Sequence, residues 1–424
     1  ISRCIPGGLT LVMSVMAIFV YFIVTKGELP LATAPYYAEY ISLSVLAMTF
    51  TGMMVLVNVL SGTGIFQYIA IWCAKKAKGS PIRTMILLVF ATAVLSAFLD
   101  NVTTVLLVAP VTLLVASELS VSAIPFLMAE TMASNIGGTA TLIGDPPNIL
   151  IGSSLNLSFM DFVKELTPVV VITMAVLILA FDLVYHKRIQ TTLRHQVEVM
   201  KIRAGDSITD KSLLIKSLIV LFMVIGGFIS AEHLHIANGT IAIFGAAILL
   251  LLYTFGNAHS ERDHKIEAIF GVVDWTTIFF FSGLFVIVYG LEETGVLKML
   301  GQMFVDFTDG SIKKATLLIV WTSAILSSAI DNIPFVATMI PMIKSMEVDM
   351  GGREAMMPVW WALSLGACFG GNGTLIGASA NVIVAGMAQR EGHPIHFMRF
   401  LLWSIPVMLG SVALATAYLY IQYF

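Results

Sequence analysis

Three aspartates lie in stretches of the sequence that are otherwise apolar. They are Asp100, Asp145 and Asp331, and no Lys, Arg or His stands near any of them in the sequence. An ionisable side chain in apolar surroundings is costly and by default marks a functional site. Carboxylates without a basic partner attract protons or metal cations and repel a bare anion. We therefore predict a site for a proton or another cation, with Glu130 as a further candidate for proton coupling.

Two glycine-rich motifs would supply backbone groups to such a site. GGTATLIGDPPN covers Gly137 to Asn148, and GGNGTLIGASAN covers Gly370 to Asn381. Glycine permits the backbone conformations that interrupt a helix, and proline favours the start of a new helical segment. Backbone groups freed in this way are tolerated inside a membrane only where they line a cavity. The residues expected to break the helices are Gly137, Gly138, Gly144, Pro146, Pro147, Gly370, Gly371, Gly373 and Gly377.

Amide and hydroxyl side chains complete the predicted site, because Asn offers both donors and acceptors and Thr and Ser add hydroxyls. The residues predicted to bind substrate or ion are Asp100, Asn101, Thr103, Thr141, Asp145, Asn148, Asp331, Asn332, Thr374, Ser379 and Asn381. Those predicted to couple protons are Asp100, Asp145, Asp331 and Glu130. We expect no catalytic residue, no cofactor and no resident metal. The structural alternative is that Asp100 and Asp331 cap hairpin helices and that Asp145 caps the second half of a broken helix.

The composition places these residues in a membrane. Of the 424 residues, 58% are hydrophobic and only 12% are charged, and the mean hydropathy is +0.92. Soluble domains carry roughly 25% charged residues, so the chain has no room for a sizeable soluble domain. A net charge of −3 without a basic stripe argues against nucleic-acid binding. The three cysteines, Cys4, Cys73 and Cys368, lack the spacing of a disulfide framework or a metal site.

The hydropathy pattern predicts an all-α polytopic fold, since a transmembrane helix needs roughly 20 apolar residues. The spans expected are about 8–25, 38–60, 122–155, 162–185, 213–231, 239–256, 275–291, 355–388 and 398–422, with a short helix at 63–74. Gly, Asn and Pro interrupt 122–155 and 355–388, which we interpret as broken helices. The regions 82–118 and 312–346 each hold two arms of about 16 residues around an Asp-Asn pair. Because such an arm rises only ~24 Å, these regions are predicted to be re-entrant hairpins.

The two hairpins and the two breaks belong to an internal repeat. SAFLDNVTTVLLVAPV from Ser96 matches SSAIDNIPFVATMIPM from Ser327, and the two glycine motifs match at nearly the same offset. We predict a first repeat over 1–186, a cytoplasmic linker over 187–211 and a second repeat over 212–424. Most of the 23 basic residues fall on the cytoplasmic side if the N-terminus is inside and the C-terminus outside. The first hairpin then opens inward and the second outward, as in the inverted repeats of many secondary transporters.

The same strings carry a resemblance to a known superfamily. SAFLDNVTT, SNIGGTATLIGDPPN, SSAIDNIPF and GGNGTLIGASANV resemble motifs of the ion transporter superfamily, which includes the arsenical pump ArsB, the antiporter NhaD, the melanosomal P protein and INDY-type dicarboxylate carriers. They look most similar to the P-protein group, which is placed with the arsenite-efflux family. The resemblance implies a substrate site between hairpin tips and helix breaks, and an elevator-like movement of the hairpin-containing domain against a scaffold. The carboxylate carriers have Ser-Asn-Thr at the tips, so the aspartates of this chain argue against carboxylate transport.

The hypothesis that follows is a secondary transporter of the plasma (inner) membrane that exports arsenite or antimonite in exchange for protons. Neutral As(OH)₃ could be bound by Asn, Thr and backbone groups without a fixed cation. Capture by three thiolates is not expected, because Cys368 is the single cysteine near the motifs. The expected partners are the lipid bilayer, a small inorganic substrate, a second copy of the chain and, for a true arsenical pump, a cytoplasmic ATPase.

Other functions remain as alternatives. The first is sodium/proton exchange through the same acids, and the second is anion or carboxylate transport in which cations bridge the acids to the substrate. A channel is a further alternative. An intramembrane aspartyl protease is disfavoured, since Leu142 replaces the first glycine of the GxGD signature that precedes Asp145. We therefore expect a transporter and not an enzyme.

Overall fold

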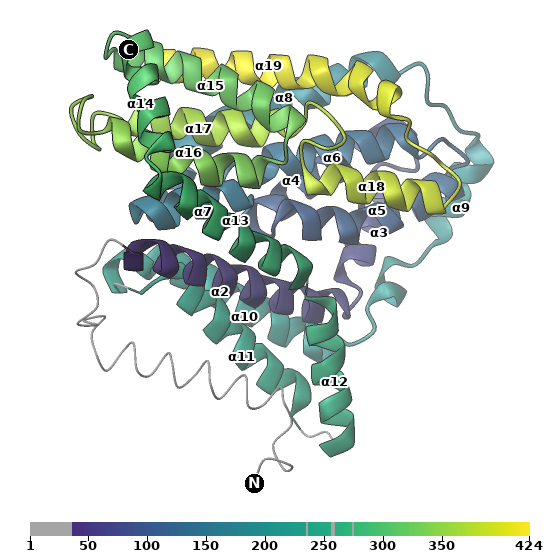
Figure 1. Cartoon of the computed structure of the whole chain (residues 1–424). Helices are drawn as coiled ribbons and strands as arrows, with labels where there is room; N and C mark the ends of the chain where they lie inside the picture. The colour runs from purple at the N-terminus through teal and green to yellow at the C-terminus, as the bar shows by residue number, and fades with distance from the viewer. Residues whose placement is uncertain (1–35, 235, 256–258, 274) are drawn as a thin grey trace. The chain divides into compact units, whose positions relative to one another are not determined.

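The described part of the chain is built from helices joined by turns and loops, without a β-strand (Figure 1). The computed structural model describes residues 36–424 apart from 235, 256–258 and 274. Within these residues, six helices are long and apolar enough to cross a membrane, and up to eight if each of two bent helix pairs counts as one span. The prediction of an all-α polytopic membrane protein is confirmed. The expected first span, 8–25, lies outside the described residues.

The helices form two compact units, and each unit takes segments from both predicted repeats. Among the described residues, unit 1 comprises 36–65 together with 208–282, and unit 2 comprises 66–207 together with 283–424. The helices of unit 1 are α2 (Tyr36–Ser61), α10 (Lys211–Leu234), α11 (Asn238–Thr254), α12 (His259–Val272) and the first part of α13 (Trp275–Glu293). All the residues predicted to bind substrate or ion lie in unit 2.

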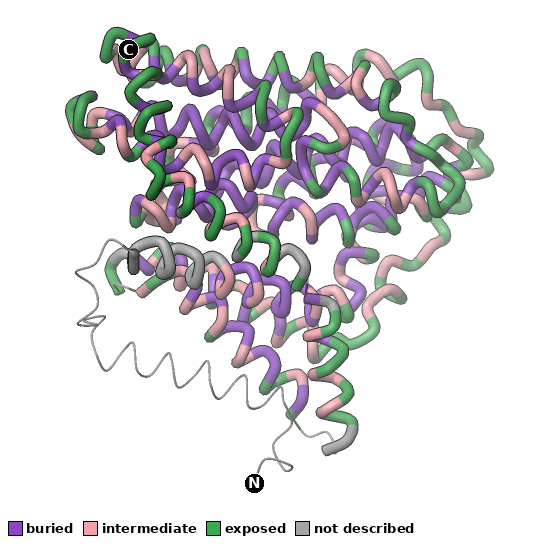
Figure 2. The backbone as a smooth tube through the Cα atoms, in the orientation of Figure 1, coloured by how far each residue is buried: buried purple, intermediate pink, exposed green. Residues whose placement is uncertain are grey.

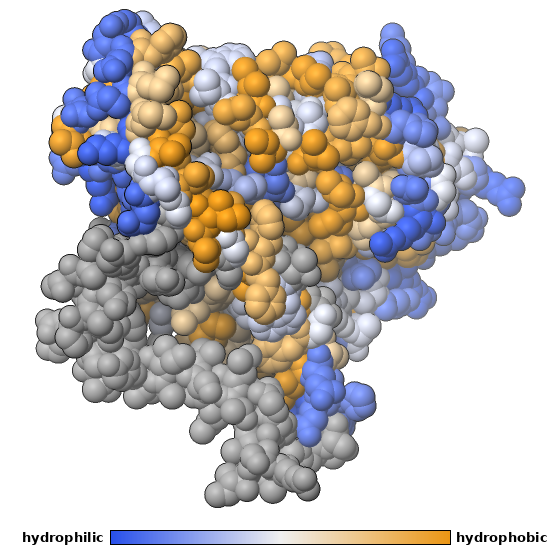
Figure 3. All heavy atoms as spheres, in the orientation of Figure 1, coloured by the Kyte–Doolittle hydropathy of each residue, from blue (hydrophilic) through white to orange (hydrophobic). Residues whose placement is uncertain are grey.

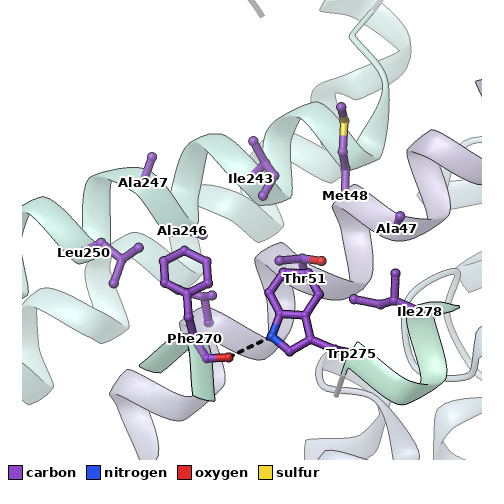
Figure 4. A pocket seen from close by; sticks show the side chains of 11 residues that line it. Ala47, Met48, Thr51, Ile243, Ala246, Ala247, Leu250, Phe270, Trp275 and Ile278 are labelled. Carbon is purple, nitrogen blue, oxygen red and sulfur yellow. Dashed lines mark hydrogen bonds between the residues drawn. The ribbon is translucent and has the colours of Figure 1, made fainter. Parts of the chain in front are cut away.

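Close helix packing and an apolar pocket characterise unit 1. Helix α11 packs against α2 and α10, and a Cβ added to Gly52 of α2 would lie 2.6 Å from the carbonyl carbon of Ala242. Small residues at such a crossing allow membrane helices to approach closely. The pocket, of about 220 Å³, lies between α2 and α11, and Phe270 and Trp275 also line it (Figure 4). Its lining is almost entirely apolar, with the Trp275 indole N–H donating to the Phe270 carbonyl at 2.9 Å, so it offers no site for an ion.

Unit 2 contains the hairpins and the broken helices at the predicted places. The hairpins are α4 (Pro81–Phe98) with α5 (Asn101–Glu118) and α15 (Ile312–Ala329) with α16 (Asn332–Met346), and the broken helices are α6 (Ile124–Gly138) with α7 (Pro146–Leu155) and α17 (Met357–Gly370) with α18 (Ser379–Arg390). Three of the hairpin arms have 18 residues rather than about 16, which corresponds to ~27 Å. The arms are therefore closer to the thickness of the hydrocarbon core than the sequence suggested.

The remaining helices of unit 2 flank these four pairs. They are α3 (Ile65–Lys76), α8 (Phe159–Tyr185), α9 (Leu193–Lys201), the short 3₁₀ helix η1 (Ala204–Ser207), the end of α13, α14 (Val296–Phe307) and α19 (Phe397–Tyr423). The sequence did not predict α9 in the linker, nor α12 and α14, because these three helices lie outside the predicted apolar spans.

The closing helices of the two halves of unit 2 run in opposite directions. Near the start of α8, the Glu165 carboxylate accepts a hydrogen bond from Tyr423 Oη, near the end of α19, at 2.6 Å. At the opposite end, the ring of Tyr185 on α8 stacks on Trp403, near the start of α19, with ring centroids 5.1 Å apart. The equivalent closing helices are therefore antiparallel neighbours (Figure 1). The hairpin α4–α5 opens toward the end of unit 2 that carries α9, and the hairpin α15–α16 opens toward the end that carries α14.

Burial is concentrated on the broken helices (Figure 2). All 15 residues of α6 are buried, and so are 13 of the 14 residues of α17. In contrast, α8 and α19 expose large apolar side chains such as Leu183 and Ile421. Apolar atoms cover the middle of unit 2, and hydrophilic atoms gather at its two ends (Figure 3). The broken helices thus form the core of unit 2, while α8 and α19 present surfaces suited to lipid.

Candidate functional site

The hairpin tips and the helix breaks form a buried polar cluster in unit 2. The non-helical segments are 139–145 and 371–378, which is shorter than predicted. Gly137, Gly138 and Gly370 still belong to the first half-helices, and Asn148 and Asn381 already belong to the second. Pro146 and Pro147 stand at the start of α7, as expected.

Asp145 connects the first break with the opposite hairpin tip. Its side chain is fully buried and caps no backbone N–H of α7. Instead, its two carboxylate oxygens accept hydrogen bonds from Asn332 Nδ2, at 3.2 and 3.4 Å. Asp145 also lies within electrostatic reach of Asp331 and Asp100, and the thiol of Cys368 lies beside it. Two further acids, one from each half of unit 2, therefore lie within electrostatic reach of the buried Asp145 carboxylate.

The other two aspartates cap the second arm of their own hairpin. Asp100 accepts hydrogen bonds from the backbone N–H of Thr103, at 2.8 Å, and from its hydroxyl. Asp331 accepts from the backbone N–H of Ile333 at 3.1 Å and from the Ser379 hydroxyl at 2.8 Å. The structural alternative considered above describes this geometry, although Asp331 remains only partly buried. Capping fixes both carboxylates at the tips without removing their charge.

Asparagine side chains link the two halves at the centre of the site. Asn101 Nδ2 donates to Asn135 Oδ1 at 3.1 Å. Asn135 Nδ2 in turn donates to Asn372 Oδ1 at 2.9 Å and to Asn381 Oδ1 at 3.0 Å. The amide nitrogen of Asn372 is buried and has no hydrogen-bond partner in the structure. Such an unpaired donor is costly, and it offers a hydrogen bond to any acceptor that enters the cluster.

The predicted residues of the two breaks mainly hold the breaks in shape. Asn148 Nδ2 donates to the carbonyls of Thr139 and Thr141, at 3.0 and 2.9 Å. Asn381 Nδ2 donates in the same way to Gly371 and Thr374, at 2.8 and 2.7 Å.

The hydroxyls of the breaks and the serines of the first hairpin arms repeat this pattern. The Thr141 hydroxyl donates to the Ala97 carbonyl on the first hairpin, and the Thr374 hydroxyl donates to the Ser328 carbonyl on the second. Ser96 and Ser327 donate to the carbonyls of Ser134 and Ala367, each at 2.7 Å. The hydrogen bonds between each helix break and its neighbouring hairpin therefore occur in both halves of unit 2.

Two pairs of glycines allow the breaks to fold tightly. A Cβ added to Gly138 would lie 2.3 Å from the Gly144 carbonyl oxygen, and one added to Gly144 would lie 2.5 Å from that of Gly138. The equivalent pair, Gly371 and Gly377, is also close, at 3.2 and 2.9 Å. At Gly373 an added Cβ would lie 2.5 Å from the Cβ of Ser328. These breaks therefore require glycine for close approach of backbone to backbone.

Glu130 lies apart from this cluster. It is buried on α6, where one carboxylate oxygen accepts a hydrogen bond from Thr112 at 2.7 Å and the other has no partner. None of its described contacts reaches the hairpin tips. For the proton-coupling role predicted for Glu130, protons would have to move between Glu130 and the hairpin tips along α5 and α6.

The sequence did not identify Asn135, Asn372, Ser364 or Cys368 as site residues. Ser364 donates to Asn148 Oδ1 at 2.6 Å, and Cys368 lies 3.7 Å from the same oxygen. The repeat could not reveal them, because Asn135 is matched by Cys368 and Asn372 by Thr139. For Asn135, Ser364 and Cys368, a position one or two turns before a break in an otherwise apolar run was the available signal, and for Asn372 it was its place inside the break.

The charge of the site is negative throughout. Among the described residues, the hydrogen-bond partners of the three aspartates are Thr, Asn, Ser and backbone N–H groups, and none of the three forms a salt bridge. The described residues also contain no group of three His, Cys, Asp or Glu side chains that could hold a metal ion. The arrangement can bind a proton or a small cation, and its amides and hydroxyls can hydrogen-bond a polar solute.

Two antiparallel halves, each with a hairpin and a broken helix around a buried polar site, define a membrane transporter. The chain belongs to the CitMHS family, described as "Citrate transporter", whose pattern matches residues 5–366. It is 46% identical to an uncharacterised transporter of Mycobacterium bovis over 373 aligned residues. The alignment covers 88% of this chain and 85% of that protein. The family and these relatives are transporters and not enzymes.

Two further comparisons extend this relationship. The chain is 34% identical over 461 residues to the P protein of Mus musculus, covering 91% of this chain and 54% of that protein, so it spans about half of the P protein. The crystal structure of the YdaH transporter of Alcanivorax borkumensis has the same fold, with a TM-score of 0.61 and 13% identity, covering 91% of this chain and 86% of that one. The predicted relationship to the P protein is confirmed. Membership of the ArsB branch of the superfamily stays a prediction.

Proposed function

We propose that the protein is a cation-coupled secondary transporter whose coupling cation binds at Asp145. The observation that carries this proposal is a fully buried carboxylate that is paired with the amide of Asn332 and with no basic side chain. Asp331 and Asp100 add to the negative potential around it. A buried charge without a counter-ion is costly. A proton or sodium ion that enters the site at each cycle would remove this cost.

The finer function that we propose is efflux of arsenite or antimonite in exchange for protons. A neutral oxyacid suits a site that has hydrogen-bonding groups but no base to hold an anion. The unpaired Asn372 amide is an available donor of this kind, and the Ser364 oxygen, whose hydrogen is donated to Asn148, can still accept a hydrogen bond. Cys368 is the single cysteine beside the site, so the proposal relies on hydrogen bonds to As(OH)₃ and not on three thiolates.

A second candidate is transport of a carboxylate together with a cation. The description of the family, "Citrate transporter", favours it. In a site with three acids, a carboxylate would need an accompanying cation to bridge it to the protein. The third candidate is sodium/proton exchange without a further solute, since the three aspartates alone could bind both cations.

The proposal includes a moving part. All the predicted site residues belong to unit 2, which is compact by itself, and this supports an elevator-like movement of unit 2 as a body. We further propose that the protein works in the plasma (inner) membrane with its N-terminus in the cytoplasm, and that Glu130 carries protons between the site and the cytoplasmic end of the first hairpin.

The test is flux into liposomes that contain the purified full chain, under an imposed pH gradient. Arsenite, sodium, and citrate with or without a divalent cation are compared in parallel. We expect a pH gradient to drive arsenite movement in the wild type. Asp145→Asn, which keeps the size of the side chain but removes its charge, should abolish the gradient-driven flux.

Asp309→Asn is the matched control, because Asp309 is exposed and pairs with Lys314 at the start of α15, at the other end of this helix from Asp331. It should behave like the wild type. Wild-type flux in Asp145→Asn would refute the coupling role. Movement of citrate or sodium without any arsenite flux would leave the coupling role intact and replace the proposed substrate.

A further inference from the structure

A basic cleft of about 500 Å³ lies at the end of unit 2 that carries α9. One wall is the turn between α3 and α4, with Lys78 and Ser80, followed by Arg83 in the first turn of α4. The second wall is the end of α8 with His186, and the third is the linker, with Gln190 and Gln196. Three separate segments of the chain therefore build it.

The linker wall is held in place by specific contacts. Lys75 Nζ donates to the carbonyls of Met200 and Ile202, at 3.0 and 2.7 Å. The Thr191 hydroxyl donates to the Leu119 carbonyl at 2.5 Å. Val199 of α9 is buried against Ala74, Val115 and Leu119. The part of the predicted linker up to residue 207 thus belongs to unit 2 and closes the cleft on one side.

The packing between the first and third walls is equally close. Gly79 has a φ of +68°, and an added Cβ would lie 2.8 Å from the Cα of Gln196. Lys78, just before it, has a φ of +54°. A left-handed conformation at a non-glycine residue is uncommon. It fixes the direction in which the chain presents Lys78 at the cleft.

The cleft is positively charged. None of the described residues that line it is acidic. Among the described side chains, Lys78 and Arg83 have no ion-pair partner, whereas His186 Nδ1 lies 3.2 Å from Asp182 Oδ1. The cleft also faces the start of α4, where the Ser80 side chain forms no capping hydrogen bond. The N-terminal end of an 18-residue helix adds to the attraction for an anion.

The cleft lies where two membrane spans end. Helix α4 begins at Pro81 and α8 ends at Tyr185, and both are long and apolar enough to cross a membrane. Directly before the cleft, α8 exposes Leu183 by 73% and Leu179 by 56%. Hydrophilic atoms gather at this end of unit 2, next to the apolar middle (Figure 3). A ligand here can therefore place an anionic group in the cleft and acyl chains along α8.

We propose that this cleft binds the headgroup of an anionic phospholipid. The phosphate lies between Lys78 and Arg83, and the acyl chains follow the exposed face of α8. Basic pockets between membrane helices bind such headgroups in other proteins. A free phosphate shares the chemistry of the headgroup, but it would not use the apolar face of α8 beside the cleft.

The test is the dissociation constant of phosphatidylglycerol added to the delipidated full chain in detergent, measured by native mass spectrometry. Each basic residue contributes roughly fivefold to the binding of an anionic lipid, so Lys78→Gln/Arg83→Gln should weaken binding about 30-fold. Phosphatidylcholine should bind weakly to both proteins. Inorganic phosphate at the same concentration should not displace phosphatidylglycerol.

The matched control is Lys76→Gln/Arg188→Gln, which removes the same charge from exposed residues at the same end that do not line the cleft. Its binding should stay within about threefold of the wild type. Equal losses in both double variants would mean a diffuse surface effect and would overturn the proposal, as would unchanged binding in Lys78→Gln/Arg83→Gln. Displacement by phosphate alone would assign the cleft to a soluble anion and overturn the lipid.

Discussion

Asn148 and Asn381 provide the sharpest test of how the site is built. The sequence predicts both as ligands of the substrate. In the structure, the Nδ2 atom of each uses its hydrogens on two carbonyls of its own helix break. Each Oδ1 also accepts a hydrogen bond, from Ser364 at 2.6 Å and from Asn135 at 3.0 Å, respectively. We predict that Asn148→Ala and Asn381→Ala act first on stability and only through it on transport.

The magnitude follows from the hydrogen bonds lost. Each substitution leaves two break carbonyls without their amide partner, and three of these four carbonyls belong to buried residues. An unsatisfied buried acceptor costs about 1–3 kcal/mol, so each variant, with two such carbonyls, should lose about 2–6 kcal/mol of its free energy of unfolding. At roughly 2–4 °C per kcal/mol, the Tm should fall by at least about 4 °C and by up to about 24 °C. Since the two geometries match, the two losses should be similar.

The assay is thermal unfolding of the purified full chain in detergent, followed by tryptophan fluorescence, with flux measured on the same preparations. Asn58→Ala is the control, because Asn58 is half-buried in α2 and has no side-chain hydrogen bond in the described structure. Its Tm should not fall. If Asn148→Ala and Asn381→Ala kept the wild-type Tm but lost transport, the two amides would contact substrate and the reasoning would be refuted.

Two further predictions concern the broken helices. An added Cβ would lie 2.3 Å from the Ala93 carbonyl oxygen at Gly137, and 2.6 Å from that of Ala324 at Gly370, so either Gly→Ala change should lower the Tm through overpacking of about 1–3 kcal/mol. Gly386→Ala, with open space around it, should not lower it, and an equal loss there would contradict the packing argument. Glu130→Gln keeps an acceptor for Thr112, so the Tm should stay within about 2 °C while proton-driven flux falls. Unchanged flux would remove Glu130 from the coupling groups.

Much of the fold could be predicted because the membrane restricts what the sequence can do. Apolar stretches located the helices, and the Asp-Asn pairs located the turns of both hairpins at Asp100 and Asp331, since polar groups in such stretches need a structural reason. The extent of the breaks could not be predicted. The glycines were expected to end the first half-helix, but α6 continues to Gly138. Glycine adopts helical as well as non-helical conformations, so its presence alone does not fix where a helix ends.

The contacts of the linker could not be predicted for a different reason. Most of its residues are exposed, and nothing local indicates that Val199 is buried against α3 and α5 or that Thr191 binds the Leu119 carbonyl. Both contacts join residues far apart in sequence. They depend on how α3, α5 and α9 meet, which a pattern of single residues does not encode.

The site itself shows that identity between the repeats and function are different signals. The matched pairs, such as Thr141 with Thr374 and Asn148 with Asn381, bind backbone carbonyls in the same way in both halves. Both breaks need these contacts, so both repeats have the same residue. At some buried positions that face the centre the repeats differ, although Asn101 and Asn332 are matched: Asp145 corresponds to Ala378.

The same difference holds at two further central positions, where Asn135 corresponds to Cys368 and Thr139 to Asn372. A pair of identical halves would give a symmetric site with matching charge on both sides. In this chain, one half brings a buried carboxylate and the other brings a thiol and an unpaired amide. The residues that distinguish one solute from another should therefore be sought among Asp145, Cys368 and Asn372, where the repeats disagree, and not among the pairs that first revealed the repeat.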